Sequence, residues 1–416
     1  MTNKILILLS LFLFAQSFGQ RMVIKNVNII PINENIVLKN KSVLIENGKI
    51  IKIDDFNKLV LDKTEKIIDA KNKFLMPGLA DMHVHLHEKE SLDALFLLNI
   101  AAGVTQIRVM NSDVNQGELK SSLNQKIKPT IHFSYIFSRA NTINQIDSIF
   151  TDVKKNNLDF VKLFSVKDEN TFDAVMNRAK QENKIVCGHY PSGVSIDKVL
   201  KSGFKSIEHL PAYYKDENIN NLEENIKLTK ENNVYNCPTF DYFVTAFNYQ
   251  YPNDYKNRLT FQKAPKSYKE KWDKALKAKI EKNGEKKFIE FGEEYKATFE
   301  KQKMIFKKLY DSNCLLLVGS DPSGLFQMSG FTMHDEMLFW STLGIDTYSI
   351  LKSATLIPAG FFGEQNKWGS VEVNKDADLI ILSKNPLENI GNLSTIEIVI
   401  KQGEIYKQKD LLKSIK

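Results

Sequence analysis

Eight short apolar segments in the middle of the chain limit the possible folds more than any other feature. Stretches with helical character separate them, and they lie at 79–87, 105–110, 130–135, 160–165, 185–190, 206–210, 234–239 and 315–321. Strands that alternate with helices form parallel β-α units, and eight such units predict a TIM (β/α)8 barrel. An open doubly wound α/β sheet is the alternative, but the glycine-rich phosphate turn typical of that fold does not appear early in the sequence.

The two ends of the chain differ from this middle part. Residues 20–76 and 366–416 contain short β-rich runs and no helical period, and Asn47-Gly48 is a hairpin signal between two of these runs. We therefore expect a small composite β-sandwich formed by both ends, beside a barrel that spans 77–365. A length of 416 residues is consistent with two or three domains.

Residues 1–19 have the pattern of a secretory signal peptide. Lys4 precedes an apolar run at 5–14, and the small residues Ser17 and Gly19 mark the cleavage region. A membrane anchor is the alternative, but a spanning helix needs roughly 20 apolar residues and this run is about half as long. We expect a mature protein without a membrane span, exported to the periplasm or secreted.

Charge and cysteine content exclude several other classes. The net charge of +7 comes from 57 basic and 50 acidic residues that are interspersed, so we expect no nucleic-acid partner. Cys187, Cys237 and Cys314 are too few for a disulfide scaffold and lack the spacing of a structural zinc site. We expect them to be buried as small hydrophobic residues.

One segment, at about 252–311, is highly charged and lacks an obvious strand. Trp272, Leu276 and Ile280 recur there at helical spacing. We expect a helical insertion after the seventh strand, with an apolar stripe that faces the core. A lid over the site is the second possibility, because the loops after barrel strands form the active site.

Polar residues stand at the ends of four of the eight segments and in the middle of a fifth. They are His83 and His85 in the first, Lys162 in the fourth, His189 in the fifth, His209 in the sixth and Asp321 in the eighth. Each could be an ordinary polar residue, but four of the seven histidines occupy equivalent strand ends. A buried ammonium group is costly. Lys162 is better explained as a neutral amine that carbon dioxide converts into a carbamate bridging two cations.

This set of groups suggests a hydrolytic metal centre. Imidazole and carboxylate-type oxygens suit zinc first, and also manganese, iron or cobalt. Two cations roughly 3.5–4 Å apart would hold a water, lower its pKa from 15.7 to about 7 and polarise a substrate carbonyl. Asp321 could then act as general base and return the proton to a leaving nitrogen.

At this point the chain resembles the amidohydrolase superfamily, over nearly all of the mature sequence. The resemblance rests on P-G-x-x-D-x-H-x-H at 77–85, the strand-end residues above, and the tail segments 353–359, 369–382 and 385–387. It implies that His83, His85 and Asp321 bind the buried metal. His189 and His209 would bind the more exposed one, with carboxylated Lys162 as the bridge.

Within the superfamily the set is closest to the prolidase-like branch and its imidazolonepropionase-related neighbours. That branch often has R-D after the second strand, whereas Val109 follows Arg108 here, which puts substrate details in doubt. The Tyr190 hydroxyl is a weaker catalytic candidate, which could donate a hydrogen bond to the developing oxyanion. His132, Arg139 and His334 are weaker candidates for substrate contacts.

The sequence therefore predicts an exported metal-dependent amidohydrolase acting on an amide or peptide bond of a small substrate, such as a dipeptide. Alternatives are a cyclic-amide hydrolase or lactonase on the same site, a non-catalytic ligand-binding barrel, and a surface interaction protein that uses the lysine-rich insertion. Homo-oligomerisation is left open.

Overall fold

The computed structural model describes residues 21–61, 65–86, 92–138, 142–246 and 255–415. The predicted signal peptide and Arg139 lie outside these ranges, so both remain predictions. Among the helices in the described ranges, none combines the length and the hydropathy of a membrane-spanning segment.

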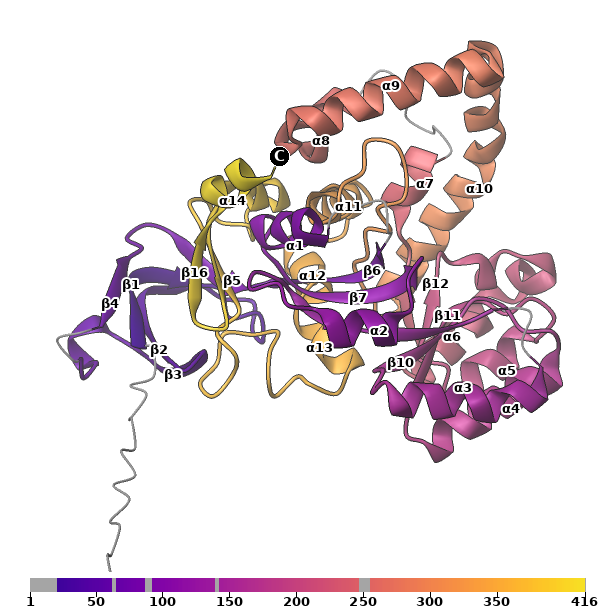
Figure 1. Cartoon of the computed structure of the whole chain (residues 1–416), viewed down its shortest axis with the longest axis horizontal. Helices are drawn as coiled ribbons and strands as arrows, with labels where there is room; N and C mark the ends of the chain where they lie inside the picture. The colour runs from indigo at the N-terminus through magenta and orange to yellow at the C-terminus, as the bar shows by residue number, and fades with distance from the viewer. Residues whose placement is uncertain (1–20, 62–64, 87–91, 139–141, 247–254, 416) are drawn as a thin grey trace, which may run out of the picture.

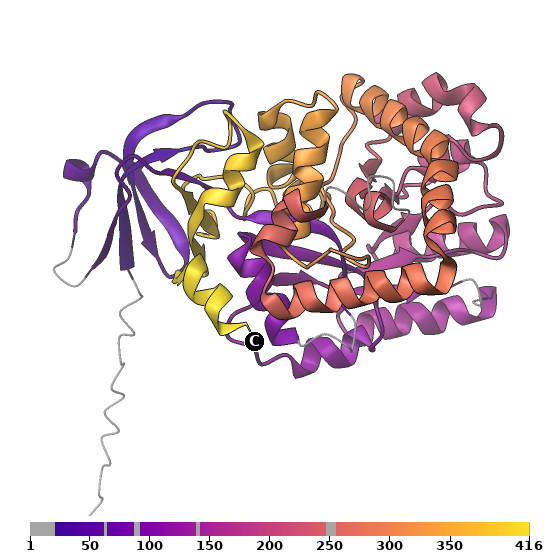
Figure 2. The ribbon, with the colours of Figure 1, turned by 90° about the horizontal axis from the view of Figure 1, so that it is seen from above.

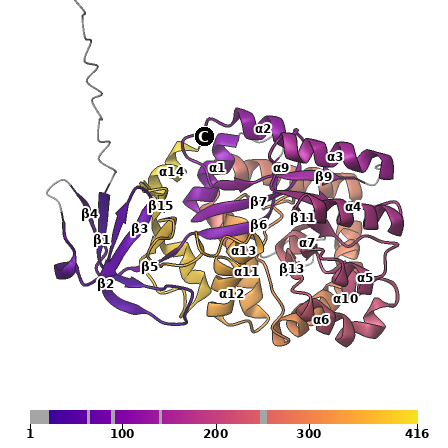
Figure 3. The ribbon, with the colours of Figure 1, turned by 90° about the horizontal axis from the view of Figure 1, so that it is seen from below.

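Strands from both ends of the chain form one sheet beside the barrel (Figures 1 and 3). They are β1 (Arg21–Ile29), β2 (Leu38–Glu46), β3 (Lys49–Asp54), β4 (Lys66–Asp69), β5 (Phe74–Pro77), β14 (Leu379–Leu382), β15 (Ile396–Lys401) and β16 (Glu404–Lys407). Their order is β16-β15-β14-β5-β1-β2-β3, with β4 paired to β1. Because β5 pairs with both β1 and β14, it joins the N-terminal strands to the C-terminal ones.

The predicted hairpin turn between β2 and β3 is present. Asn47 and Gly48 have φ angles of 52° and 73°. Positive φ at both central residues is what a type I′ hairpin requires, and Asn-Gly is the pair that adopts it most readily. The sheet encloses its own apolar core, so the expected β-rich domain from both chain ends is confirmed.

The middle of the chain forms the predicted TIM barrel. Its strands are β6 (Leu79–Leu86), β7 (Val104–Ser112), β8 (Thr130–His132), β9 (Ser134–Phe137), β10 (Phe160–Leu163), β11 (Ile185–His189), β12 (Ser206–Glu208) and β13 (Tyr235–Cys237). The run expected at 130–135 is divided at Phe133, so that β8 pairs with β7 and β9 pairs with β10.

The eighth predicted strand, at 315–321, closes the ring through single backbone contacts. Leu316 forms a parallel bridge to Asn236 of β13. On the other side, Met82 N donates to Val318 O at 3.0 Å, and Asp321 N donates to His83 O at 2.8 Å. Asp321 is thereby fixed beside the end of β6.

Helices surround the barrel, and the alternation of each strand decides which side chains face them. They are α1 (Leu92–Ala101), α2 (Gln116–Ser122), α3 (Ile143–Lys155), α4 (Glu169–Gln181), α5 (Ile196–Lys201), α6 (Leu222–Glu231), α7 (Phe240–Ala246), α11 (Phe331–Thr342), α12 (Thr347–Ser353), α13 (Leu356–Phe361) and α14 (Gln408–Ser414). In β10, Val161 and Leu163 belong to the large core shared with these helices, whereas Phe160 belongs to the smaller core inside the barrel. Lys162 alternates with Val161 and so faces the interior.

The segment expected as an insertion contains α8 (Leu259–Lys263), α9 (Lys266–Asn283) and α10 (Glu285–Asp311). Figures 1 and 2 show α9 and α10 as an angled pair outside the barrel. Trp272 and Leu276 are buried and Ile280 packs against the same core, as the helical stripe indicated. The Asp335 carboxylate accepts from the backbone N–H groups of Leu259 and Thr260, which ties the start of α8 to α11.

Candidate metal centre

Strand β6 brings two imidazoles to the carboxyl end of the barrel. Its pairing with β7 shifts register between Asp81 and Val84, and irregularities of this kind redirect side chains. The Val84 side chain packs in the large core outside the barrel, whereas His83 and His85 face the site from one side of the strand.

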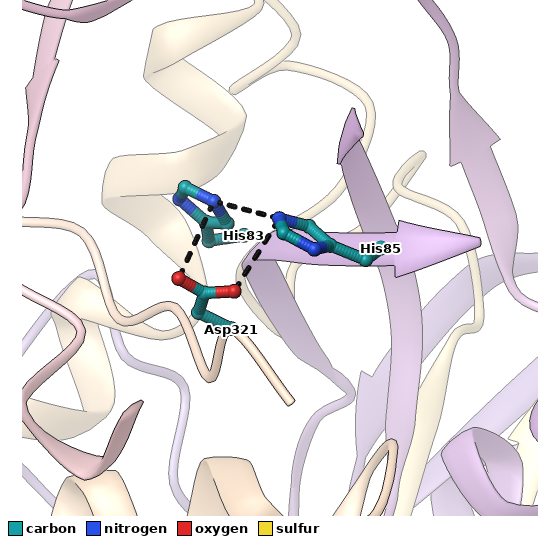
Figure 4. Close-up of side chains that lie close together, drawn as sticks. All are labelled: His83, His85 and Asp321. Carbon is teal, nitrogen blue, oxygen red and sulfur yellow. Dashed lines mark hydrogen bonds and ion pairs between the residues drawn. The ribbon is translucent and has the colours of Figure 1, made fainter. Parts of the chain in front are cut away.

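Asp321 completes a trio of ligand groups (Figure 4). The Nε2 atoms of His83 and His85 are 3.4 Å apart. The Asp321 carboxylate lies 3.3 Å from His85 Nε2 through Oδ1 and 3.8 Å from His83 Nε2 through Oδ2. A φ of 43° gives Asp321 a left-handed backbone conformation at the end of the eighth predicted strand. The three side chains therefore offer two nitrogens and a carboxylate to one point.

The opposite nitrogen of each imidazole has its own partner. His83 Nδ1 lies 2.9 Å from Glu208 Oε2. An ionised carboxylate can only accept, so the proton of His83 is on Nδ1 and a lone pair of Nε2 faces the site. His85 Nδ1 lies 3.2 Å from the Ser323 hydroxyl, which is also 2.9 Å from Asp321 Oδ1. If Ser323 donates to Asp321, its oxygen accepts from His85.

This arrangement fits a divalent cation. Burial holds the pKa of His83 well below its usual value of 6.5, so the ring is neutral. Two Nε2 lone pairs and a carboxylate that face each other at these distances repel unless a cation lies between them. Metal-binding histidines have their second nitrogen held by a carboxylate or another acceptor in the same way.

His209 lies beside His83, with 4.9 Å between ring centroids, and His189 lies next to His209, so both extend the site. Their ring centroids are 5.0 Å apart, and His209 Nε2 is 3.9 Å from Asp321 Oδ2. His209 Nδ1 lies 2.6 Å from the Thr239 hydroxyl, which leaves Nε2 toward the site. Burial lowers the pKa of both histidines well below 6.5, so both are neutral ligand candidates.

Lys162 lies near the same cluster, within electrostatic range of His83, His189 and Asp321. It is 1% exposed, and its Nζ is 4.8 Å from the centroid of the Phe164 ring. Within the described ranges Lys162 forms no ion pair. Burial lowers its pKa from 10.5 to about 8, because an ammonium without a carboxylate partner is poorly solvated there. The structure thus brings together all six residues predicted as ligands.

A buried ion pair supports this cluster and was missed in the sequence. Arg108 donates to both carboxylate oxygens of Glu208, at 2.8 and 3.0 Å, and both side chains have 0% exposure. Arg108 also donates to Ser206 and to the backbone of Met82. In the sequence, Glu208 could have been recognised as a charged residue in a buried strand, directly before His209. Because His209 has a φ of 66°, both Glu208 and His209 can face the interior.

Three weaker predictions concern Tyr190, His132 and His334. The Tyr190 hydroxyl donates to Val194 O at 2.7 Å, within its own loop. His132 stacks on Phe362 at 3.7 Å between ring centroids and contacts Gln106, near the start of β7. His334 Nε2 donates to Ala102 O, in the outer helical layer. The structure places His132 and His334 away from the ligand cluster, so neither is part of it.

Fold and site together define a TIM-barrel protein with a metal-ligand cluster at the carboxyl ends of its strands. The model of the amidohydrolase family matches residues 74–406. The chain belongs to the amidohydrolase family.

The individual proteins that resemble this chain in sequence or structure share little sequence identity with it. A dihydroorotase of Bacillus cytotoxicus is 28% identical over 182 residues, which are 40% of this chain and 41% of that protein. The chain therefore matches about two fifths of the length of such relatives. A solved Xaa-Pro dipeptidase with methionine in its active site has a TM-score of 0.69 at 20% identity, covering 93% of this chain and 100% of that one. Molinate hydrolase has a TM-score of 0.71 at 13% identity, covering 95% and 96%. These two structures share the fold.

Proposed function

We propose that the protein is a metal-dependent amidohydrolase that cleaves a C–N bond, an amide or peptide bond, in a small substrate such as a dipeptide. The observation that carries this proposal is the convergence of His83 Nε2, His85 Nε2 and the Asp321 carboxylate, with both Nδ1 atoms held from behind. Membership of the amidohydrolase family supports it, as does the fold shared with an Xaa-Pro dipeptidase.

Two divalent cations, zinc first, would be held by this chain. His83, His85 and Asp321 would hold one, and His189 and His209 the other, with carboxylated Lys162 between them. A lowered lysine pKa favours this modification, because only the neutral amine adds carbon dioxide. When bound, such cations polarise a carbonyl and acidify water.

Asp321 is suited to move the proton. Burial raises its pKa from 3.8 to about 7, which is near the optimum for a group that both accepts and donates a proton at neutral pH. Ser323 binds Oδ1 and leaves Oδ2 toward His209. In the proposed reaction Asp321 takes one proton from water, the remaining hydroxyl adds to the carbonyl carbon, and Asp321 gives the proton to the leaving nitrogen as the C–N bond breaks.

The first test is the number of metal ions per chain. Protein that begins at Gln20 would be produced with zinc or manganese and bicarbonate, and analysed for bound metal. About two ions per chain are expected. One would favour a mononuclear site and contradict the role of Lys162, and none in folded protein would favour a non-catalytic barrel.

Activity is tested with a panel of dipeptides, cyclic amides and lactones. Asp321→Asn should abolish turnover and leave the circular dichroism spectrum unchanged, because the amide cannot accept the proton. A folded Asp321→Asn protein that retains full activity would exclude the assigned role.

Export is a separate proposal that rests on residues 1–19. Protein recovered from the periplasm or medium of a producing bacterium should begin near Gln20, which N-terminal sequencing would detect. Retention of Met1 would contradict it.

A further inference from the structure

A cavity of about 470 Å³ lies between helix α9 and the loop that follows Asp321. Pro322 and Ser323 form part of its wall. Ser323 also contacts His85 and Asp321, so this wall is continuous with the metal-ligand cluster. We call this space the α9 cavity.

Aromatic side chains form a rigid part of the α9 cavity. Tyr242, Tyr268 and Trp272 all line it. The Tyr242 ring lies 6.2 Å from the His209 ring, which again relates the cavity to the ligand cluster. Trp272 is 5% exposed and packs against Phe326 at 5.7 Å between ring centroids, so its position is set by the core. These rings give part of the cavity wall an apolar surface.

The charged side chains that line the α9 cavity are both cationic. Lys271 and Lys279 line it, and no aspartate or glutamate does so among the described residues. Helix α9 carries seven lysines against three acidic residues, an excess of four positive charges. Asp241, which lies behind Gln327 of the cavity wall, is paired with Arg258 at 2.6 and 2.7 Å. Its charge is therefore already compensated.

We propose that the substrate carries a carboxylate at the end remote from the metal ligands, and that Lys271 and Lys279 bind this group in the α9 cavity. Tyr268 and Trp272 contact the apolar part of the substrate that adjoins it. This inference rests on the proposed function, since it names the class of substrate that the hydrolase takes: a small amide with an acidic and apolar distal part. The insertion then serves as the element that selects the substrate.

The test compares an acid with its amide on two matched variants. N-acetylphenylalanine and N-acetylphenylalaninamide differ only in the terminal group, a carboxylate in the first and a neutral carboxamide in the second. Their binding to metal-loaded protein would be measured by calorimetry. Lys271→Gln/Lys279→Gln removes two charges that line the cavity. Lys274→Gln/Lys277→Gln removes two charges from exposed positions of the same helix outside the cavity wall, and so controls for the long-range field.

We expect the wild-type protein to prefer the acid, and the cavity variant to bind the acid about tenfold more weakly, which is ~1.4 kcal/mol. Binding of the amide should stay unchanged, and the control variant should resemble the wild type. The inference is overturned by equal affinity for both probes, by absence of binding to either, or by a cavity variant that keeps the full preference for the acid. In the last case the metal ions would be the source of the preference.

The same measurements separate this inference from the proposed function. The heat of binding is separated from any heat of hydrolysis by assaying the calorimeter cell for released acetate, whereas the function is judged by metal content and hydrolysis. A wild-type protein that binds two metals and hydrolyses amides, but shows no preference for an acid, would overturn only the inference. A protein without metal and without hydrolysis would overturn the function, and the substrate assignment with it.

Discussion

The strongest single test of the site concerns Glu208, which contacts His83 but is not itself a predicted ligand. Its carboxylate accepts from His83 Nδ1 at 2.9 Å and pairs with Arg108 through both oxygens. Glu208→Gln keeps the volume of the side chain and removes its charge. Among the described residues Glu208 is the one that forms an ion pair with Arg108, so the buried guanidinium then loses this counter-ion.

The expected magnitude follows from burial. Both partners have 0% exposure, and loss of one partner of a buried pair costs roughly 3–5 kcal/mol. A separate effect concerns the metal, because removing a carboxylate that orients a ligand histidine typically lowers metal affinity about 10–100-fold. The surface pair Lys201–Asp197, with side chains 55% and 57% exposed, provides a control. Asp197→Asn should cost less than ~1 kcal/mol.

Two measurements distinguish these effects. Urea unfolding in the presence of a chelator gives the stability of metal-free protein, and competition with a zinc indicator gives metal affinity. The double variant Arg108→Met/Glu208→Gln removes both charges, so we expect it to recover much of the lost stability but not the lost zinc affinity. If the Glu208→Gln protein does not fold, the double variant still tests whether Glu208 raises the affinity of the site for zinc.

Two results would refute the reasoning. Metal-free Glu208→Gln protein within ~1 kcal/mol of the wild type would show that the buried charge of Arg108 is compensated elsewhere. Unchanged zinc affinity in both variants would show that Glu208 does not orient His83.

Three further predictions concern the lysine, a remote histidine and a glycine. Lys162→Ala should retain about one metal ion per chain, and short carboxylic acids should restore part of the second site; two ions and full activity without them would exclude the carbamate. Burial lowers the pKa of His334 from 6.5 to about 4. Between pH 6.5 and pH 4 the folded protein therefore binds fewer protons than the unfolded chain. The free energy of unfolding should then decrease as the pH falls through this range, by up to ~1.4 kcal/mol per pH unit. His334→Gln should flatten this slope in urea unfolding at pH 4–6.5, and an unchanged slope would count against it. A Cβ on Gly188, whose φ is 140°, would lie 2.2 Å from Leu163 O and 2.8 Å from Lys162 Cδ, whereas nothing lies within 4 Å of a Cβ on Gly193. Gly188→Ala should therefore lower both thermal stability and metal content much more than Gly193→Ala, and equal effects would contradict the close packing.

The sequence alone determined the barrel and the order of its polar strand ends. Strand and helix periods are local properties, so the eight segments and the Asn47-Gly48 turn could be recognised without any tertiary information. In a parallel barrel all strands end on one face, which is why residues as far apart as His83 and Asp321 could be expected to meet.

Only the tertiary structure decided what surrounds those ligands. The partner of His83 is 125 residues away, in Glu208, and no local pattern specifies that contact. The direction of His209 and Asp321 depends on positive φ angles at turns, which strand periodicity does not describe. His132 occupies a strand like the ligands do, yet its height along the barrel puts it against Phe362 instead of the site. Likewise, Lys271 and Lys279 of α9 line the same cavity as the loop after Asp321, although more than forty residues separate them from it in the sequence.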